Sequence, residues 1–150
     1  MNDILIREIR EADLPSVLDM VRGLAAHHGD VAQVTLGDLR RDCLGDVPWL
    51  RVLVADKAGA LSGYAALCPL AQMQFGVRGM DLHHLFVTAQ ARGSGVGRAL
   101  IDGSTALTKS LGCRYMTVGT HPDNTAAAQV YRAAGFDCLP PPGPRFRVKF

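Results

Sequence analysis

A stretch rich in glycine and arginine at residues 92–98 is the part of the sequence best suited to bind a charged ligand. It reads Arg92-Gly93-Ser94-Gly95-Val96-Gly97-Arg98. Glycines permit tight turns and close approach of a ligand, and the first N–H groups of a following helix point toward an anion. The two arginines at its ends would add charged donors. The stretch therefore predicts a phosphate-binding turn.

Two common phosphate motifs do not fit this turn. A Walker loop needs Lys-Ser/Thr after its last glycine, and a dinucleotide fingerprint that starts at Gly93 would need a glycine where Arg98 stands. The turn does match R-x-x-G-x-G from Arg92 and Q-x-x-G-x-G from Gln90. A plain, flexible connection between a strand and a helix is the alternative interpretation.

The elements that must position the turn follow from hydrophobic periodicity and from glycine stops. We expect helices near residues 13–29, 36–44, 95–111 and 124–135, with Asp13 and Asn124 as N-caps. Strands are predicted at residues 4–9, 49–55, 61–70, 80–88, 115–118, 136–139 and 146–150. This order indicates an α/β fold with an antiparallel first half and one parallel crossover.

The composition is that of one compact domain, residues 1–150, with 48% hydrophobic residues and a net charge of +2. Such a small, evenly spread charge argues against nucleic acid or a membrane surface as a partner. No run approaches the ~20 apolar residues of a membrane span, and the start of the chain lacks a signal core. We expect a soluble, cytoplasmic protein whose four scattered cysteines are reduced and mostly buried.

Residues 85–100, which contain the turn, are followed at residues 124–136 by Asn-Thr-Ala-Ala-Ala-Gln-Val-Tyr-Arg-Ala-Ala-Gly-Phe. Together these segments resemble the GNAT superfamily of acyl-CoA-dependent N-acetyltransferases. The first half and the 49–55 strand are more loosely similar to the diamine (spermidine/spermine-type) branch. The resemblance implies a mixed central sheet of about six to seven strands flanked by about four helices.

The resemblance also implies acetyl-CoA as co-substrate, lying in a V-shaped split that a bulge opens in the 80–88 strand. Asn124 matches a position that contacts pantetheine, and Tyr131 matches the general acid to the departing thiolate. The cofactor contacts implied are Leu85, Phe86, Val87, Arg92, Gly93, Ser94, Gly95, Val96, Gly97, Arg98, Asn124 and Ala127. No cysteine occupies a motif position, so we expect direct transfer.

Acetylation of an amine needs a base, because amines are protonated at neutral pH. Strand alternation places Asp81 and His83 on one face with Leu85 and Val87, and His84 on the other. His83 or Asp81 would then be the base, and a bulge that breaks the alternation would make His84 a third candidate. Surface or core histidines with no catalytic role remain the alternative.

The acceptor pocket is implied near His27 and His28, with His84 as a further substrate contact. The diamine branch carries acids where His83 and His84 stand, which argues against a polycationic amine. We expect no metal, since these adjacent histidines would project in different directions.

The function that these features favour is N-acetylation of a primary amine on a small molecule. Three alternatives stay open: a non-catalytic acyl-CoA-binding or sensing module, an enzyme that acetylates a protein or peptide amine, and a nucleotide-phosphate enzyme. The resemblance leaves a homodimer open as well.

Overall fold

The computed structural model describes residues 3–150, which form two compact units, one ending at Gly119 and the other spanning Thr120–Phe150. The single-domain organisation therefore stays a prediction. No helix within the described residues is long and apolar enough to cross a bilayer.

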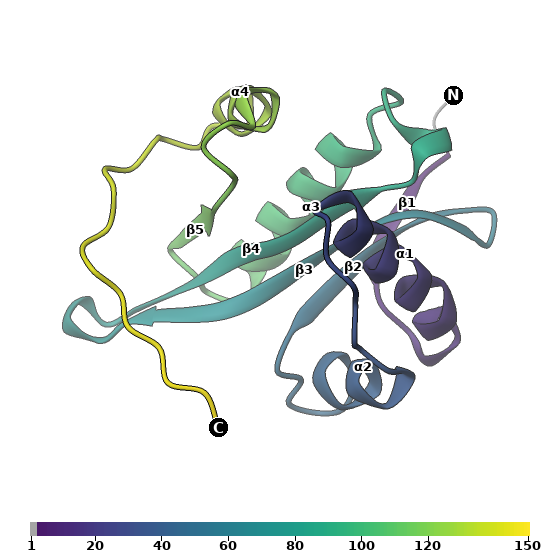
Figure 1. Ribbon diagram of the computed structural model, residues 1–150, viewed down its shortest axis with the longest axis horizontal. Helices are drawn as coiled ribbons and strands as arrows, with labels where there is room; N and C mark the ends of the chain where they lie inside the picture. The colour runs from purple at the N-terminus through teal and green to yellow at the C-terminus, as the bar shows by residue number, and fades with distance from the viewer. Residues whose placement is uncertain (1–2) are drawn as a thin grey trace. The chain divides into compact units, whose positions relative to one another are not determined.

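The first unit is built on one five-stranded sheet in the order β1-β2-β3-β4-β5 (Figure 1). β1 (Leu5–Glu8), β2 (Arg51–Lys57), β3 (Ala60–Gln72) and β4 (Val77–Val87) pair antiparallel, and β5 (Tyr115–Val118) runs parallel to β4. The antiparallel first half and the single parallel crossover are confirmed. Short 3₁₀ turns lie at η1 (Glu11–Asp13), η2 (Met73–Phe75) and η3 (Ala89–Ala91).

Two helices cover one face of this sheet. α1 (Leu14–His27) places Leu14 and Val17 in a buried cluster with Tyr64 of β3. α2 (Leu36–Cys43) adds Leu39 and begins with a capping box, because Thr35 accepts from Asp38 N–H and Asp38 accepts from Thr35 N–H. Asp13 is the N-cap of α1 as expected, but its carboxylate binds Arg7 and the N–H of Arg10 instead of the helix.

The opposite face carries α3 (Val96–Ser110), which Figure 1 shows behind the sheet. Val96 and Leu100 lie against Gly63 of β3, where a β-carbon would meet the carbonyl of Phe86 at 2.5 Å. This close approach requires glycine, so α3 sits directly on the sheet and its N-terminus is held at the end of β4.

The second unit contains α4 (Thr125–Ala133), which begins at its Asn124 cap. Residues 136–139 and 146–150 form no strand, so the prediction of these two strands is wrong and the sheet has five strands instead of six or seven. The physical reason is that neither segment forms backbone hydrogen bonds with a neighbouring strand. Prolines 140, 141, 142 and 144 have no N–H to offer, and the Phe136 N–H bonds to Tyr131 of α4.

The cysteines differ from expectation. Cys43 is buried, Cys68 and Cys113 are half-buried, and Cys138 is exposed, all four as free thiols. The expectation of mostly buried thiols is therefore wrong.

Candidate active site

A β-bulge interrupts β4 at His83. Ala66 of β3 pairs with His84, but the next residue, Leu67, pairs with Leu82, so His83 is an extra residue without an opposite partner. The bulge implied for this strand is therefore present. An extra residue in one strand bends that strand and re-aims the side chains beside it.

The bulge changes which residues share a face. Paired residues of neighbouring strands lie on the same face, and the even-numbered residues Cys68, Ala66 and Tyr64 pair with Asp81, His84 and Phe86. Leu82, Leu85 and Val87 pair with the odd-numbered residues of β3 and lie on the α3 face. The predicted grouping of Asp81 and His83 with Leu85 and Val87 is therefore wrong.

Both bulge histidines project to the same side. Their imidazole rings stack with centroids 4.3 Å apart and planes 15° apart. The expectation that this pair diverges is wrong, because a bulge removes the alternation that would separate neighbouring side chains. Even so, no group of three metal-ligating side chains occurs within residues 3–150.

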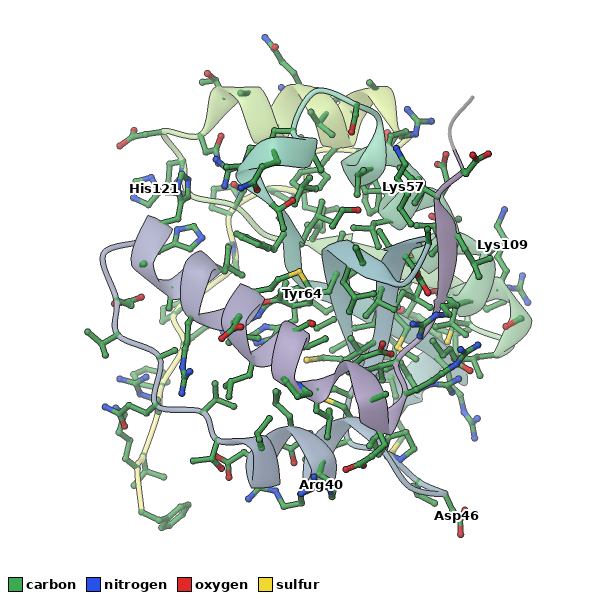
Figure 2. The ribbon with its side chains drawn as sticks, turned by 90° about the vertical axis from the view of Figure 1, so that its right-hand side faces the viewer. Arg40, Asp46, Lys57, Tyr64, Lys109 and His121 are labelled. Atoms are coloured by element: carbon green, nitrogen blue, oxygen red, sulfur yellow. The ribbon has the colours of Figure 1, made fainter. Side chains whose placement is uncertain are left out.

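His84 is tied to the core by Tyr64. The Tyr64 hydroxyl lies 3.0 Å from His84 Nδ1, and the tyrosine is 1% exposed. Figure 2 shows Tyr64 in the interior of the first unit. Burial, together with the neighbouring His83 and His28, lowers the pKa of His84 to about 4, so this imidazole is neutral at pH 7. His83 is exposed.

Two further candidates end helix α1. His27 is its last residue and His28 its C-cap, and their rings meet edge to face at 5.6 Å. His28 is close enough to His84 to lower the pKa of that ring. The structure thus brings His28, His83 and His84 to one region on the α1 face of the sheet.

Asp81 lies before the bulge and is already engaged. Its Oδ1 accepts a 2.6 Å hydrogen bond from the hydroxyl of Thr117 on β5. This bond crosses the parallel β4–β5 pair, at the register Asp81↔Thr117. One of its two oxygens is therefore already engaged in a hydrogen bond within the sheet.

The pairing of β4 with β5 stops at the bulge. It covers Gly79 to Leu82, while β4 itself continues to Val87. Thr88 N–H donates to Ser62 at 2.9 Å, and successive residues of a strand direct their backbone groups to opposite sides. The backbone groups of Leu85 and Val87 therefore point away from β3, toward the edge that β5 leaves open.

Phe86, between these two residues, directs its backbone groups to β3 and packs its ring on Gly23 of α1.

The glycine turn joins this open edge to α3. Gly93 and Gly95 adopt left-handed φ values of +79° and +89°, and a β-carbon at Gly93 would meet nothing within 4 Å. Arg92 Nε donates to the Val87 carbonyl at 3.2 Å. The first N–H groups of α3 have no partner within the helix. These features fit an anion at the turn.

The other residues of the turn hold it in place. Ser94 directs its N–H and its hydroxyl to the carbonyl of Ala91, and Val96 is 1% exposed. A β-carbon at Gly97 would meet the Val87 side chain at 3.7 Å, an ordinary contact distance. Arg98 pairs with Asp102 at 3.0 Å on the surface of α3.

In the second unit, Asn124 caps α4 by accepting from Ala127 N–H at 3.0 Å, which leaves its NH₂ group as a donor for a ligand. Tyr131 is half-buried beside the ring of Phe136, with centroids 5.9 Å apart. Burial raises the pKa of the Tyr131 phenol, which keeps it protonated at neutral pH.

A comparison with protein families gives one decisive match. The model of the Acetyltransferase (GNAT) family matches residues 19–136, well over half of the chain. The chain belongs to the GNAT family of acetyltransferases. It is an acetyl-transferring enzyme.

Individual GNAT relatives act on different molecules. The chain is 27% identical over 145 residues to thialysine N-epsilon-acetyltransferase of Sus scrofa, covering 90% of this chain and 85% of the relative. It is 31% identical over 119 residues to mycothiol acetyltransferase of Cellulomonas flavigena, covering 74% of this chain but only 34% of that relative.

Solved structures show the same fold. An aminoglycoside acetyltransferase, meta-AAC0020 from an uncultured soil sample, in complex with sisomicin, matches with a TM-score of 0.81 and 17% identity over 99% of this chain and 97% of its own. Aminoglycoside N-acetyltransferase AAC(6')-Iy in complex with CoA matches with a TM-score of 0.79 and 23% identity, over 96% and 94%.

Sequence reasoning missed two residues that contact the candidate site, Tyr64 beside His84 and Thr117 beside Asp81. Tyr64 lies within an apolar strand, where its position is typical of a core residue. Thr117 lies in a strand of only four residues. Only the strand register could have revealed them, because it pairs Tyr64 beside His84 and Thr117 with Asp81.

Proposed function

We propose that the chain transfers an acetyl group from acetyl-CoA directly to a primary amine of a small-molecule acceptor. The observation that carries this proposal is the bulge at His83, which ends the β4–β5 pairing just before the glycine turn. An open backbone edge suits the thioester and amide arm at one end of such a ligand. The anion-binding helix terminus that follows suits the phosphates at its other end.

The donor would be held by backbone groups. Leu85 and Val87 direct N–H and carbonyl groups to the open edge, and N–H groups between Gly93 and Arg98 would bind the pyrophosphate. A backbone N–H near Leu85 would also polarise the thioester carbonyl, so that negative charge developing on its oxygen is stabilised. Asn124 and Ala127 would contact the pantetheine region.

The acceptor would lie on the α1 face, beside His27, His28, His83 and His84. His83 is the best base, since its imidazole is exposed and lies at the bulge, stacked on His84. Its ring would remove the proton of the attacking amine, directly or through a water molecule. Asp81 is held by Thr117, so it would serve to fix β5 beside the bulge.

The leaving thiolate needs a proton, which Tyr131 would supply. Its phenol is protonated at neutral pH because burial raises its pKa. The base first takes one proton from the ammonium group. The nitrogen–carbon bond then forms as the carbon–sulfur bond breaks, the phenol proton goes to the sulfur, and the second proton released by the nitrogen restores the phenol. The products are an N-acetylamine and a free thiol.

Two measurements test this proposal. Calorimetric titration should show binding of acetyl-CoA and none of ATP at the same concentration. A panel containing thialysine, an aminoglycoside, a diamine and a short peptide with a free N-terminus should then give thiol release with at least one small amine.

The alternative outcomes are distinct. Binding without thiol release from any amine would indicate a non-catalytic acyl-CoA module. Release with the peptide alone would indicate a protein or peptide acceptor. Preferential ATP binding would exclude the acetyl-CoA donor.

A further inference from the structure

Tyr64 is a buried phenol whose hydroxyl has one hydrogen-bonding partner within the described residues. That partner is His84 Nδ1 at 3.0 Å. The ring packs against Phe86 and His84, with centroids 6.1 Å away in each case. Burial raises the pKa of this phenol, so the hydroxyl keeps its hydrogen over the whole physiological range.

This geometry decides which nitrogen of His84 carries the proton. If Nδ1 carried it, Nδ1–H would donate to the phenol oxygen and the buried hydroxyl hydrogen would lack an acceptor. If Nε2 carries it, the hydroxyl donates to the Nδ1 lone pair and both groups are satisfied. The penalty for an unsatisfied buried donor favours the second tautomer by roughly tenfold or more.

We infer that Tyr64 is a positioning residue that holds His84 as the Nε2–H tautomer, a hydrogen-bond donor to the bound reactants and not the catalytic base. The inference rests on the proposed function of the same site. Nε2 lies on the far side of the ring from Tyr64, so its hydrogen is directed away from the core. The base is then His83, which makes no comparable hydrogen bond to a buried group within residues 3–150.

The surroundings of His84 agree with a neutral donor. The titratable groups beside it are His83 of β4, His28 at the end of α1 and Tyr64 of β3, with Cys43 of α2 behind the tyrosine. Of these, His83 and His28 carry positive charge when protonated, and both oppose a charge on His84. A hydrogen bond to an acceptor atom of the substrate, such as a carbonyl oxygen, is the contact that Nε2–H can make.

The tautomer can be measured without turnover. Nitrogen-15 NMR at pH 7 should show His84 with a protonated Nε2 and an unprotonated Nδ1, the signal being assigned by its loss in His84→Gln. In Tyr64→Phe, which removes only the hydroxyl, the Nδ1–H tautomer should become populated. A wild-type His84 that is Nδ1-protonated, or charged, at pH 7 would overturn the inference.

Kinetics supply a second, independent readout. Glutamine can keep a donor near the place of Nε2–H but has no tautomers. His84→Gln should therefore lose less than about tenfold in kcat/KM, whereas His83→Gln should lose on the order of a hundredfold. If His84→Gln gives the larger loss instead, His84 is the base and the inference fails.

A double-variant cycle separates positioning from mere structure. Tyr64→Phe should lower kcat several-fold in the wild-type background with little change in the KM for acetyl-CoA. In the His84→Gln background the same change should have little further effect, because there is no tautomer left to fix. Equal losses in both backgrounds would mean that Tyr64 acts only through packing.

These results are distinguishable from failure of the proposed function. If no amine is acetylated, the NMR result still decides the state of His84. If acetylation occurs but His84 carries its proton on Nδ1, the inference alone falls.

Discussion

Tyr131 is the residue whose hydroxyl is expected to matter most to the transfer step. Tyr131→Phe keeps the ring and removes the proton donor, so kcat should fall on the order of a hundredfold while acetyl-CoA binding stays unchanged. Steady-state kinetics and calorimetric titration measure the two quantities. Tyr115→Phe is the matched control, because that ring packs over Gly79 and its hydroxyl is not part of the proposed site. Unchanged turnover in Tyr131→Phe would remove this residue from the mechanism.

Asp13 makes the stability of the first unit sensitive to acid. The bond from the Arg7 guanidinium, at 2.7 Å, is the main reason that the pKa of this buried carboxyl lies below its usual value. Because the folded pKa is the lower one, the stabilisation is present above about pH 4, the unfolded value, and is lost as the pH falls through the folded pKa.

Asp13→Asn should therefore lower the free energy of unfolding at pH 7 by roughly 2–4 kcal/mol, since it leaves the Arg7 charge short of one partner. The difference should shrink below pH 4. Urea unfolding at pH 7 and pH 3 measures both. Asp19→Asn, whose side chain is 81% exposed, should change neither value appreciably. A loss that is the same at both pH values would contradict the assignment.

At the level of elements, the glycine turn has two properties, a left-handed backbone and a proposed role in binding the donor. A matched pair of substitutions separates their effects on stability and on binding. Gly93 and Gly112 flank α3 with φ values of +79° and +76°, and a β-carbon at either would meet nothing within 4 Å. Each change to alanine should cost about 1–2 kcal/mol of stability, because L residues disfavour this conformation.

Only Gly93→Ala should also weaken acetyl-CoA binding, by about tenfold, which corresponds to roughly 1.4 kcal/mol. Titration of both variants at a temperature where each is folded measures this difference. If Gly112→Ala weakens binding equally, the turn has no special role in holding the donor.

Helix α3 also contains two buried hydroxyls without a hydrogen-bonding partner among the described residues, those of Ser104 and Thr108. A buried unpaired hydroxyl costs free energy, and alanine is the better helix former. Ser104→Ala should therefore raise the free energy of unfolding by about 1 kcal/mol, measured by thermal or urea unfolding. A clear destabilisation would mean that this hydroxyl has a partner such as a water molecule.

How far the sequence predicts these elements depends on the kind of signal. Helix starts at Thr35 or Asn124 are set by local hydrogen bonds, so caps and periodicity locate them well. The face of Asp81 could not be predicted, since it depends on where β4 gains an extra residue against β3. The strand expected from residue 49 begins at Arg51, since Trp49 is of a type enriched in strands but lies exposed before the first paired residue.

For the molecule as a whole, Trp49 limits one common measurement. It is the chain's sole tryptophan and is 79% exposed in the folded protein. Its emission maximum should therefore lie near that of an indole in water and shift little on unfolding, while far-UV circular dichroism shows the full transition. A large blue shift in the native protein would show that this ring is covered, for example by a second copy of the chain.

The end of the chain shows why pattern alone is insufficient at this scale. Phe146, Val148 and Phe150 alternate with basic residues as a half-buried strand would, yet all three are exposed. Alternation predicts a strand only if a neighbouring ladder accepts it, and no local signal specifies that neighbour. The glycine turn, by contrast, needs only its own glycines and the helix that follows.

The extra residue in β4 has a consequence for genetic variation. Removing the codon of His83 would restore an unbroken alternation against β3. The residues on both sides would keep their faces, because Leu82 already pairs with Leu67 and His84 with Ala66. The bend that the extra residue gives to β4 would be lost, at the point where the pairing with β5 stops. An in-frame deletion of this one residue should thus leave the sheet intact yet close the edge that is proposed to hold the donor, an effect that a substitution at the same position would not reproduce.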